Sequence, residues 1–276
     1  MKGGAMIRKD KWATRFTLLF GVAFIVSAGM VWRIAAKRQE ERAAFRELDE
    51  CVKVEIAYPI QNASYEQPAN DETPSPYTSL KEQNPDFFGW IAIEGTELNY
   101  PIMHTPEEPE YYLRRDFEGE KSQSGVPFLS ASCYEGCGNY LIYGHNMRNG
   151  SMFATLLSYA DREYWETHPM IQLDTLSDAG EYTVMGAFYS EAYRKDATNA
   201  FRFYQYVDLN VRDIFDEYVE QVLHASLYDT GVRAEYGDQL ITLVTCSYHK
   251  KNGRFVVVAR KQTGERAKHA CLLFNK

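Results

Sequence analysis

The chain has 276 residues, and 45% of them are hydrophobic, which is enough for one sizeable domain with additional segments. Its net charge of −8 argues against nucleic-acid binding, because nucleic-acid-binding proteins usually carry a basic surface. The twenty tyrosines and fifteen phenylalanines favour β-structure.

The N-terminal region contains an apolar segment of the length needed to cross a membrane. Residues 16–32 carry no charge, and Arg33 can extend its side chain to the interface, which adds 34–36 to the apolar length. We predict an uncleaved transmembrane helix over 16–36. A cleaved signal peptide is the alternative, but no small-x-small cleavage site follows the apolar run.

The charges that flank this segment predict its orientation. Five basic residues and one acidic residue precede it, which favours a cytoplasmic N-terminus over 1–15 and an extracellular remainder. Basic residues at 33, 37, 38 and 42 reduce this asymmetry. The predicted location is therefore the cell membrane, with a single pass and an extracellular C-terminal domain.

A helical arm and a linker are predicted over 37–79. Residues 35–56 are rich in Ala, Glu, Arg and Gln, with apolar residues at helical spacing. Residues 58–79 contain four prolines among Asn, Ser and Asp, which is typical of a linker or an extended arm. The main domain is predicted to occupy 80–276.

Strand signals dominate this domain and predict a mainly β fold, a β-barrel with inserted helices. Three segments have helical patterns: 152–159, 161–167 and 213–226. The predicted strands are 89–93, 98–103, 126–129, 140–143, 181–189, 240–245 and 254–260.

The five cysteines leave at least one thiol unpaired in an extracellular domain. Cys133 and Cys137 could pair, or they could be small loop residues. A Cys-x₃-Cys pair without a nearby histidine is a poor zinc site, and the chain has no glycine-rich phosphate loop. We therefore predict neither a metal nor another cofactor.

A possible catalytic group lies near the C-terminus, where Cys246 ends one strand and Arg254 opens the next. If these strands pair as a hairpin, Arg254 lies roughly opposite Cys246. Cysteine attacks carbonyl groups as its thiolate, and arginine can stabilise a thiolate or an oxyanion but cannot act as a base. The base must come from elsewhere, and His145 follows the apolar strand 140–143 and a glycine. A structural thiol and a surface or core histidine are the alternatives.

Several motifs together resemble the sortase family. TLVTC and RFVVVAR resemble the cysteine and arginine segments, and IYGHNM resembles the histidine segment. NPDFFGWIAIEGTELNYPIM at 84–103, YYLRRDF at 111–117 and YGHNMRNGSMF at 143–153 are most similar to class B sortases. The resemblance covers about residues 80–262.

The resemblance implies a role for each matching residue in a sortase-type closed β-barrel. Cys246 is implied as the nucleophile, His145 as the general acid, and Arg254 as the residue that holds the oxyanion and the substrate. Thr245 is implied to help orient the substrate. The backbone N–H of Ser247 is a candidate oxyanion donor.

The implied function is a membrane-anchored cysteine transpeptidase. It would cleave an Asn-Pro-x-Thr sorting signal of a surface protein at Thr, through a thioester, and transfer the protein to an amine of the peptidoglycan precursor. Alternatives are a pilin-polymerising sortase, a papain-like hydrolase and a non-catalytic membrane-anchored binding domain. An unreactive Cys246 would indicate the binding domain.

Overall fold

The computed structural model describes residues 6–57, 75–194, 196–198 and 200–262. The chain divides into two compact units, residues 1–47 and residues 48–276. Most of the predicted linker, residues 58–74, lies outside the described residues, as do residues 263–276.

A single long helix, α1 (Met6–Ala57), contains both the predicted transmembrane segment and the predicted arm. Its stretch from residue 15 to residue 53 has a mean hydropathy of 2.0 in its most apolar window, and no part of that window is buried within the protein. Large apolar side chains such as Leu19, Phe20 and Phe24 are exposed. By length and composition α1 could therefore cross a membrane.

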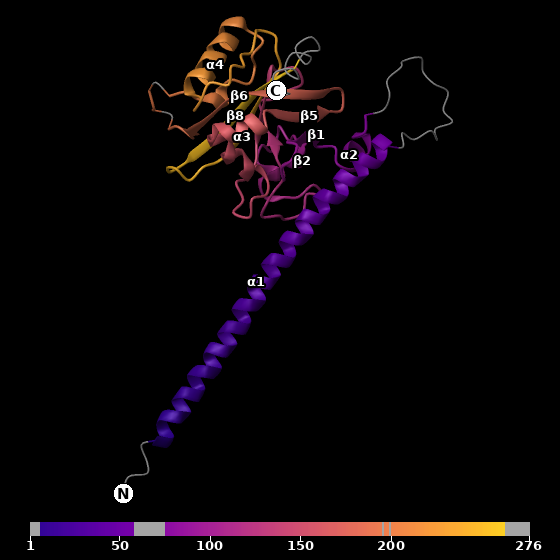
Figure 1. Ribbon diagram of the computed structural model, residues 1–276. Helices are drawn as coiled ribbons and strands as arrows, with labels where there is room; N and C mark the ends of the chain where they lie inside the picture. The colour runs from indigo at the N-terminus through magenta and orange to yellow at the C-terminus, as the bar shows by residue number, and fades with distance from the viewer. Residues whose placement is uncertain (1–5, 58–74, 195, 199, 263–276) are drawn as a thin grey trace, which may run out of the picture. The chain divides into compact units, whose positions relative to one another are not determined.

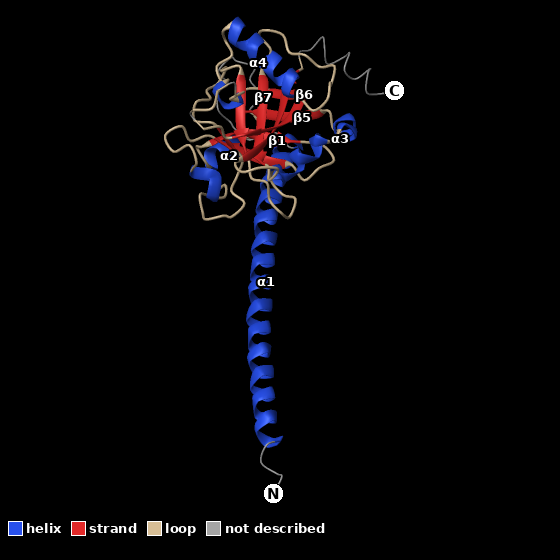
Figure 2. Ribbon diagram, turned by 90° about the vertical axis from the view of Figure 1, so that its left-hand side faces the viewer, coloured by secondary structure: helices blue, strands red, loops and turns tan. Residues whose placement is uncertain are grey.

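The second unit contains a closed barrel of eight strands, in the order β1-β2-β3-β4-β7-β8-β6-β5 (Figures 1 and 2). The strands are β1 (Phe87–Ala92), β2 (Asn99–Met103), β3 (Phe128–Leu129), β4 (Asn139–Tyr143), β5 (Met170–Thr175), β6 (Ala179–Glu191), β7 (Leu240–Cys246) and β8 (Gly253–Lys261). The predicted mainly β barrel with inserted helices is confirmed.

Helical segments fill the connections between the strands. They are α2 (Thr78–Gln83), η1 (Tyr111–Arg114), η2 (Phe153–Ala160), α3 (Arg162–Thr167), η3 (Phe203–Gln205) and α4 (Arg212–Ala225), where η marks a 3-10 helix. The α4 helix lies beside β6 (Figures 1 and 2), and a side chain at Gly186 of β6 would come within 3.1 Å of Val222 of α4.

Strands β7 and β8 are neighbours in the barrel wall and are buried on both faces. The 3-10 helix η2 packs on both of them and on β6. This double burial explains why LITLVT and FVVVA are continuous apolar runs rather than alternating ones.

Two predicted elements differ from the structure, and one strand is absent from the prediction. Strand β5 was missed, because its sequence MIQLDT has only a short alternation, with Ile171 and Leu173 buried. The predicted helix at 152–159 is the 3-10 helix η2, and the predicted strand at 126–129 forms ladder pairs only at Phe128 and Leu129. Strand β5 pairs with the adjacent β6 and with the distant β1, and β3 pairs with β2 and β4 through only one or two residues.

A buried polar network joins α4 to the two strands β4 and β7. The hydroxyl of Tyr218 donates to Thr242 at 2.5 Å, and Thr242 donates to the side-chain oxygen of Asn139 at 2.9 Å. The amide of Asn139 donates in turn to the carbonyl of Tyr206 at 2.6 Å. A satisfied network of this kind specifies how these elements pack.

Replacing Thr242 with valine keeps the shape of the side chain but leaves Tyr218 and Asn139 each without one partner. We expect the free energy of unfolding to fall by about 1–3 kcal/mol. Thermal unfolding of the full chain in detergent measures this effect. The same change at the exposed Thr198 should leave stability unchanged, and equal stability of both variants would contradict the assigned network.

Candidate active site

The hairpin of β7 and β8 brings Cys246 and Arg254 together. The register pairs Cys246 directly with Arg254, so their Cα atoms lie about 4.5–5.5 Å apart. The turn is closed by a hydrogen bond from the N–H of Ser247 to the carbonyl of Gly253 at 3.0 Å. Asn252 has a φ of 58°, a left-handed conformation that asparagine tolerates well. The predicted antiparallel pairing is confirmed.

His145 reaches the same end of the barrel from β4, which runs parallel to β7. The ladder pairs Tyr143 with Val244, and the N–H of Gly144 donates to the carbonyl of Val244 at 3.0 Å. Two residues further along each chain are His145 and Cys246. Because neighbouring strands lie about 4.8 Å apart, this register brings the imidazole and the thiol to adjacent strand ends.

Side-chain hydrogen bonds link these two strand ends. The amide of Asn146 donates to the carbonyl of Cys246 at 2.9 Å, and the hydroxyl of Thr245 donates to the carbonyl of Gly144 at 2.8 Å. A Cβ atom at Gly144 would lie only 2.5 Å from the ring of Phe153, so this position requires glycine. The backbone around His145 is therefore held on both sides.

The imidazole of His145 is oriented by a backbone carbonyl. Its Nε2 lies 2.8 Å from the carbonyl oxygen of Leu113, and because a carbonyl only accepts, Nε2 carries the hydrogen of this bond. Nδ1 is then the nitrogen available to exchange a proton with substrate. Burial lowers the pKa of His145, the bond to Leu113 opposes this effect, and the positive charge of Arg114 lowers the pKa further.

Arg254 lies on β8, between β7 and β6. On β8 it pairs with Cys246 of β7 on one side and with Ser190 of β6 on the other. Its guanidinium donates to the carbonyl of Gly253 at 3.0 Å and is partly exposed. Burial raises the pKa of Tyr143 to about 12, and the positive charge of Arg254 opposes this shift, so the guanidinium acts electrostatically on the end of β4.

The two other predicted site residues are used within the protein. Thr245 is buried, and its hydroxyl is bound to Gly144. Ser247 is also buried; its N–H is bound to Gly253, and its hydroxyl lies 2.9 Å from Nδ1 of His249. In this conformation Ser247 therefore does not offer its N–H to an oxyanion. Direct contact of Thr245 or Ser247 with substrate remains a prediction.

Two residues with a role in the site were not found from the sequence. Leu113 acts through its carbonyl, which any residue type possesses, so only the YYLRRDF motif around it carried a signal. Asn146 follows His145 directly, but its bond to Cys246 connects residues 100 apart. Such a contact follows from the parallel pairing of β4 and β7 and not from local sequence.

Residues 91–262 match the sortase domain family, and this stretch is more than half of the chain. The chain belongs to the sortase family. The matched stretch contains the complete hairpin of β7 and β8, strand β4 and the loop that carries His145. As a sortase, the protein is a cysteine transpeptidase.

Relatives of this sortase are class B members, which confirms the resemblance seen in the sequence. Sortase B of Listeria monocytogenes is 29% identical over 201 residues, which cover 70% of this chain and 77% of that protein. The Staphylococcus aureus sortase B–substrate complex has a TM-score of 0.67 at 23% identity and covers 83% of this chain and 99% of its own. A sortase B complexed with Gly3 has a TM-score of 0.66 at 23% identity and covers 82% and 99%.

Replacing Arg114 with glutamine removes the positive charge that lowers the pKa of His145. We expect the pKa of the His145 ring to rise in this variant, toward the ordinary value for histidine. An NMR titration of the ring in a Cys246→Ala background measures this, because the background removes coupling to the thiol.

The matched control for this titration is Arg115→Gln at the neighbouring position, since Arg115 is not among the groups that shift the pKa of His145. We expect only Arg114→Gln to raise the pKa of His145. Equal pKa values in the two variants would show that the charge of Arg114 does not act on His145.

Proposed function

We propose that this sortase cleaves an Asn-Pro-x-Thr sorting signal at Thr, with Cys246 as nucleophile, His145 as general acid and base, and Arg254 as the oxyanion-binding group. The observation that carries the proposal is the register of β7. It pairs Cys246 with Arg254 on one side and aligns it with His145 on the other.

The first half of the reaction forms a thioester. The Cys246 thiolate attacks the threonine carbonyl carbon, a C–S bond forms, and the carbonyl electrons move to oxygen. Arg254 stabilises this oxyanion with fixed N–H donors. When the intermediate collapses, the C–N bond breaks, and Nδ1 of His145 gives its proton to the leaving amine.

The second half transfers the acyl group to an amine. The amine attacks the thioester carbonyl and gives up a proton to His145, an amide forms, and the Cys246 thiolate leaves. The first half requires a protonated imidazole beside a thiolate at the start, whereas the second half starts with a neutral imidazole beside the thioester. Because burial lowers the pKa of His145, only part of the protein population holds this pair at neutral pH.

The substrates are proposed from the class B resemblance. The Staphylococcus aureus sortase B structure contains a substrate, and another sortase B is complexed with Gly3, which is an amine nucleophile in chemical terms. By analogy, the donor is a surface protein with a sorting signal and the acceptor is an amine of the peptidoglycan precursor.

The proposed location places residues 1–15 in the cytoplasm, residues 16–36 in the membrane and the domain at 80–276 outside. The apolar stretch of α1 supports this arrangement by its length and composition. An anchor would confine the enzyme and its membrane-bound substrates to one surface and so raise their effective concentrations.

The test is an assay of the full chain in detergent with a fluorogenic Asn-Pro-Gln-Thr-Asn peptide and triglycine. We expect cleavage, a thioester adduct in the intact mass, and a peptide–triglycine product, all absent from Cys246→Ala. Cleavage only of a Leu-Pro-x-Thr-Gly peptide would overturn the proposed signal. No cleavage of either peptide, with Cys246 no more reactive toward iodoacetamide than free cysteine, would overturn the proposed nucleophile.

Replacing Arg254 with lysine keeps the positive charge but removes the planar set of donors. We expect kcat to fall by roughly 100- to 1000-fold, because a missing oxyanion donor raises the barrier for both halves of the reaction. The control is Arg194→Lys at an exposed site, which should retain full activity. Unchanged kcat with a raised KM in Arg254→Lys would assign Arg254 to ground-state binding instead.

A further inference from the structure

The loop between β3 and β4 contains a second pair of reactive groups, which the transpeptidase reaction does not use. Cys133 and Cys137 are both free and both buried. Both sulfur atoms lie within hydrogen-bond reach of the same carbonyl oxygen, that of Asn139. Two thiols that share one carbonyl are a different case from one buried structural cysteine.

Backbone turns fix the positions of the two cysteines in the loop. The N–H of Cys133 donates to the carbonyl of Ser130, and the N–H of Cys137 donates to the carbonyl of Tyr134, both within normal hydrogen-bond distance. Gly136 has a φ of 81°, which reverses the chain between the cysteines at low steric cost. The thiol of Cys137 also lies 3.3 Å from the carbonyl of Asn139.

The two thiols shift each other's ionisation in opposite directions, which favours Cys137 as the attacking thiol. A hydrogen bond from Cys133 lowers the pKa of Cys137, and burial opposes this shift. The same bond raises the pKa of Cys133, and burial raises it further. Thiol–disulfide exchange requires one thiolate to attack and a second thiol to follow.

We propose that Cys133 and Cys137 form a reversible dithiol–disulfide pair, a redox modification site at the start of the strand that leads to His145. The oxidant is a small disulfide, represented experimentally by glutathione disulfide. This chemistry would be available to a domain outside the cytoplasm, where disulfides persist, and it does not depend on the transpeptidase reaction.

The exchange proceeds in two balanced steps. The Cys137 thiolate attacks one sulfur of glutathione disulfide, forms a mixed disulfide and releases one glutathione thiolate. Cys133 then loses its proton to water and attacks the sulfur of Cys137, which releases the second glutathione thiolate. Two electrons pass from the cysteines to the glutathione.

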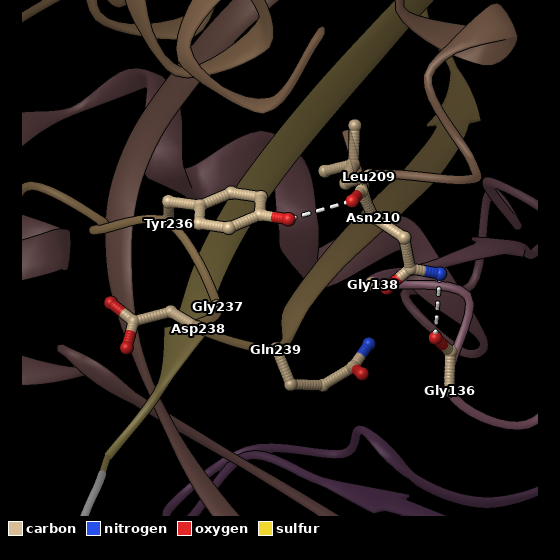
Figure 3. Close-up of a pocket in the computed structure, with 8 residues that line it drawn as sticks. All are labelled: Gly136, Gly138, Leu209, Asn210, Tyr236, Gly237, Asp238 and Gln239. Atoms are coloured by element: carbon tan, nitrogen blue, oxygen red, sulfur yellow. Dashed lines mark hydrogen bonds between the residues drawn. The ribbon is translucent and has the colours of Figure 1, made fainter. Parts of the chain in front are cut away.

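Access of the oxidant to Cys137 is controlled by the segment 208–210. The N–H of Leu209 donates to the carbonyl of Cys137 at 2.9 Å, and the amide of Asn210 donates to the carbonyl of Gly136 at 3.2 Å. Tyr236 donates to the carbonyl of Asn210 at 2.7 Å from the far side of a pocket that these residues line (Figure 3). Removing the Asn210 side chain should therefore release the loop and speed oxidation.

The experiment uses the full chain in detergent with Cys51, Cys246 and Cys271 replaced by serine, so that only the pair remains. After treatment with glutathione disulfide, we expect the intact mass to fall by two hydrogens and no cysteine to react with iodoacetamide after unfolding. Dithiothreitol should restore two reactive cysteines. Closing this short loop should raise Tm by roughly 4–8 °C.

Single substitutions test the order of attack. Cys133→Ser should trap a glutathione adduct on Cys137, whereas Cys137→Ser should leave Cys133 unmodified. Asn210→Ala should oxidise several-fold faster than the parent, and circular dichroism checks that each variant is folded. Two reactive cysteines after oxidation, or a lasting glutathione adduct in the parent, would overturn the proposal.

Discussion

The arrangement of the site depends on the pairing of β7 with two different neighbours. On one side β7 is antiparallel to β8, and a short turn sets the register that pairs Cys246 with Arg254. On the other side β7 is parallel to β4, and that register aligns its last residue with His145. A shift of one residue in either ladder would turn the side chains to the opposite face. Backbone hydrogen bonds thus define the geometry of the proposed catalytic group.

The remaining structure keeps these two registers in place. Strands β7 and β8 are buried on both faces; η2 covers them, and α4 covers the neighbouring β6. The network of Tyr218, Thr242 and Asn139 ties α4 to β4 and β7 in the interior. At the end of the barrel, Thr245 and Asn146 connect β4 to β7 again. Buried polar groups of this kind are costly to leave unpaired, which makes alternative registers unfavourable.

The residues around Cys246 differ in their exposure to solvent. Arg254 and His145 remain partly accessible, whereas Thr245 and Ser247 are buried and hydrogen-bonded within the protein. Motif residues beside a nucleophile can therefore support the backbone that carries it. The loop of Cys133 and Cys137 precedes β4 and His145 follows it, so the proposed oxidation would take place at the other end of the strand that positions His145.

The sequence by itself determined the fold class and the apolar N-terminal helix, because apolar runs define buried strands and an uncharged run of this length can span a bilayer. The turn between residues 246 and 254 is short enough to predict its own pairing, whereas the resemblance to sortase motifs predicted Cys246, His145 and Arg254 as site residues. Only the tertiary structure decided what joins residues far apart in the chain. The parallel contact of β4 with β7, the Leu113 carbonyl on His145 and the internal use of the Ser247 N–H all depend on long-range pairing, which local patterns do not encode.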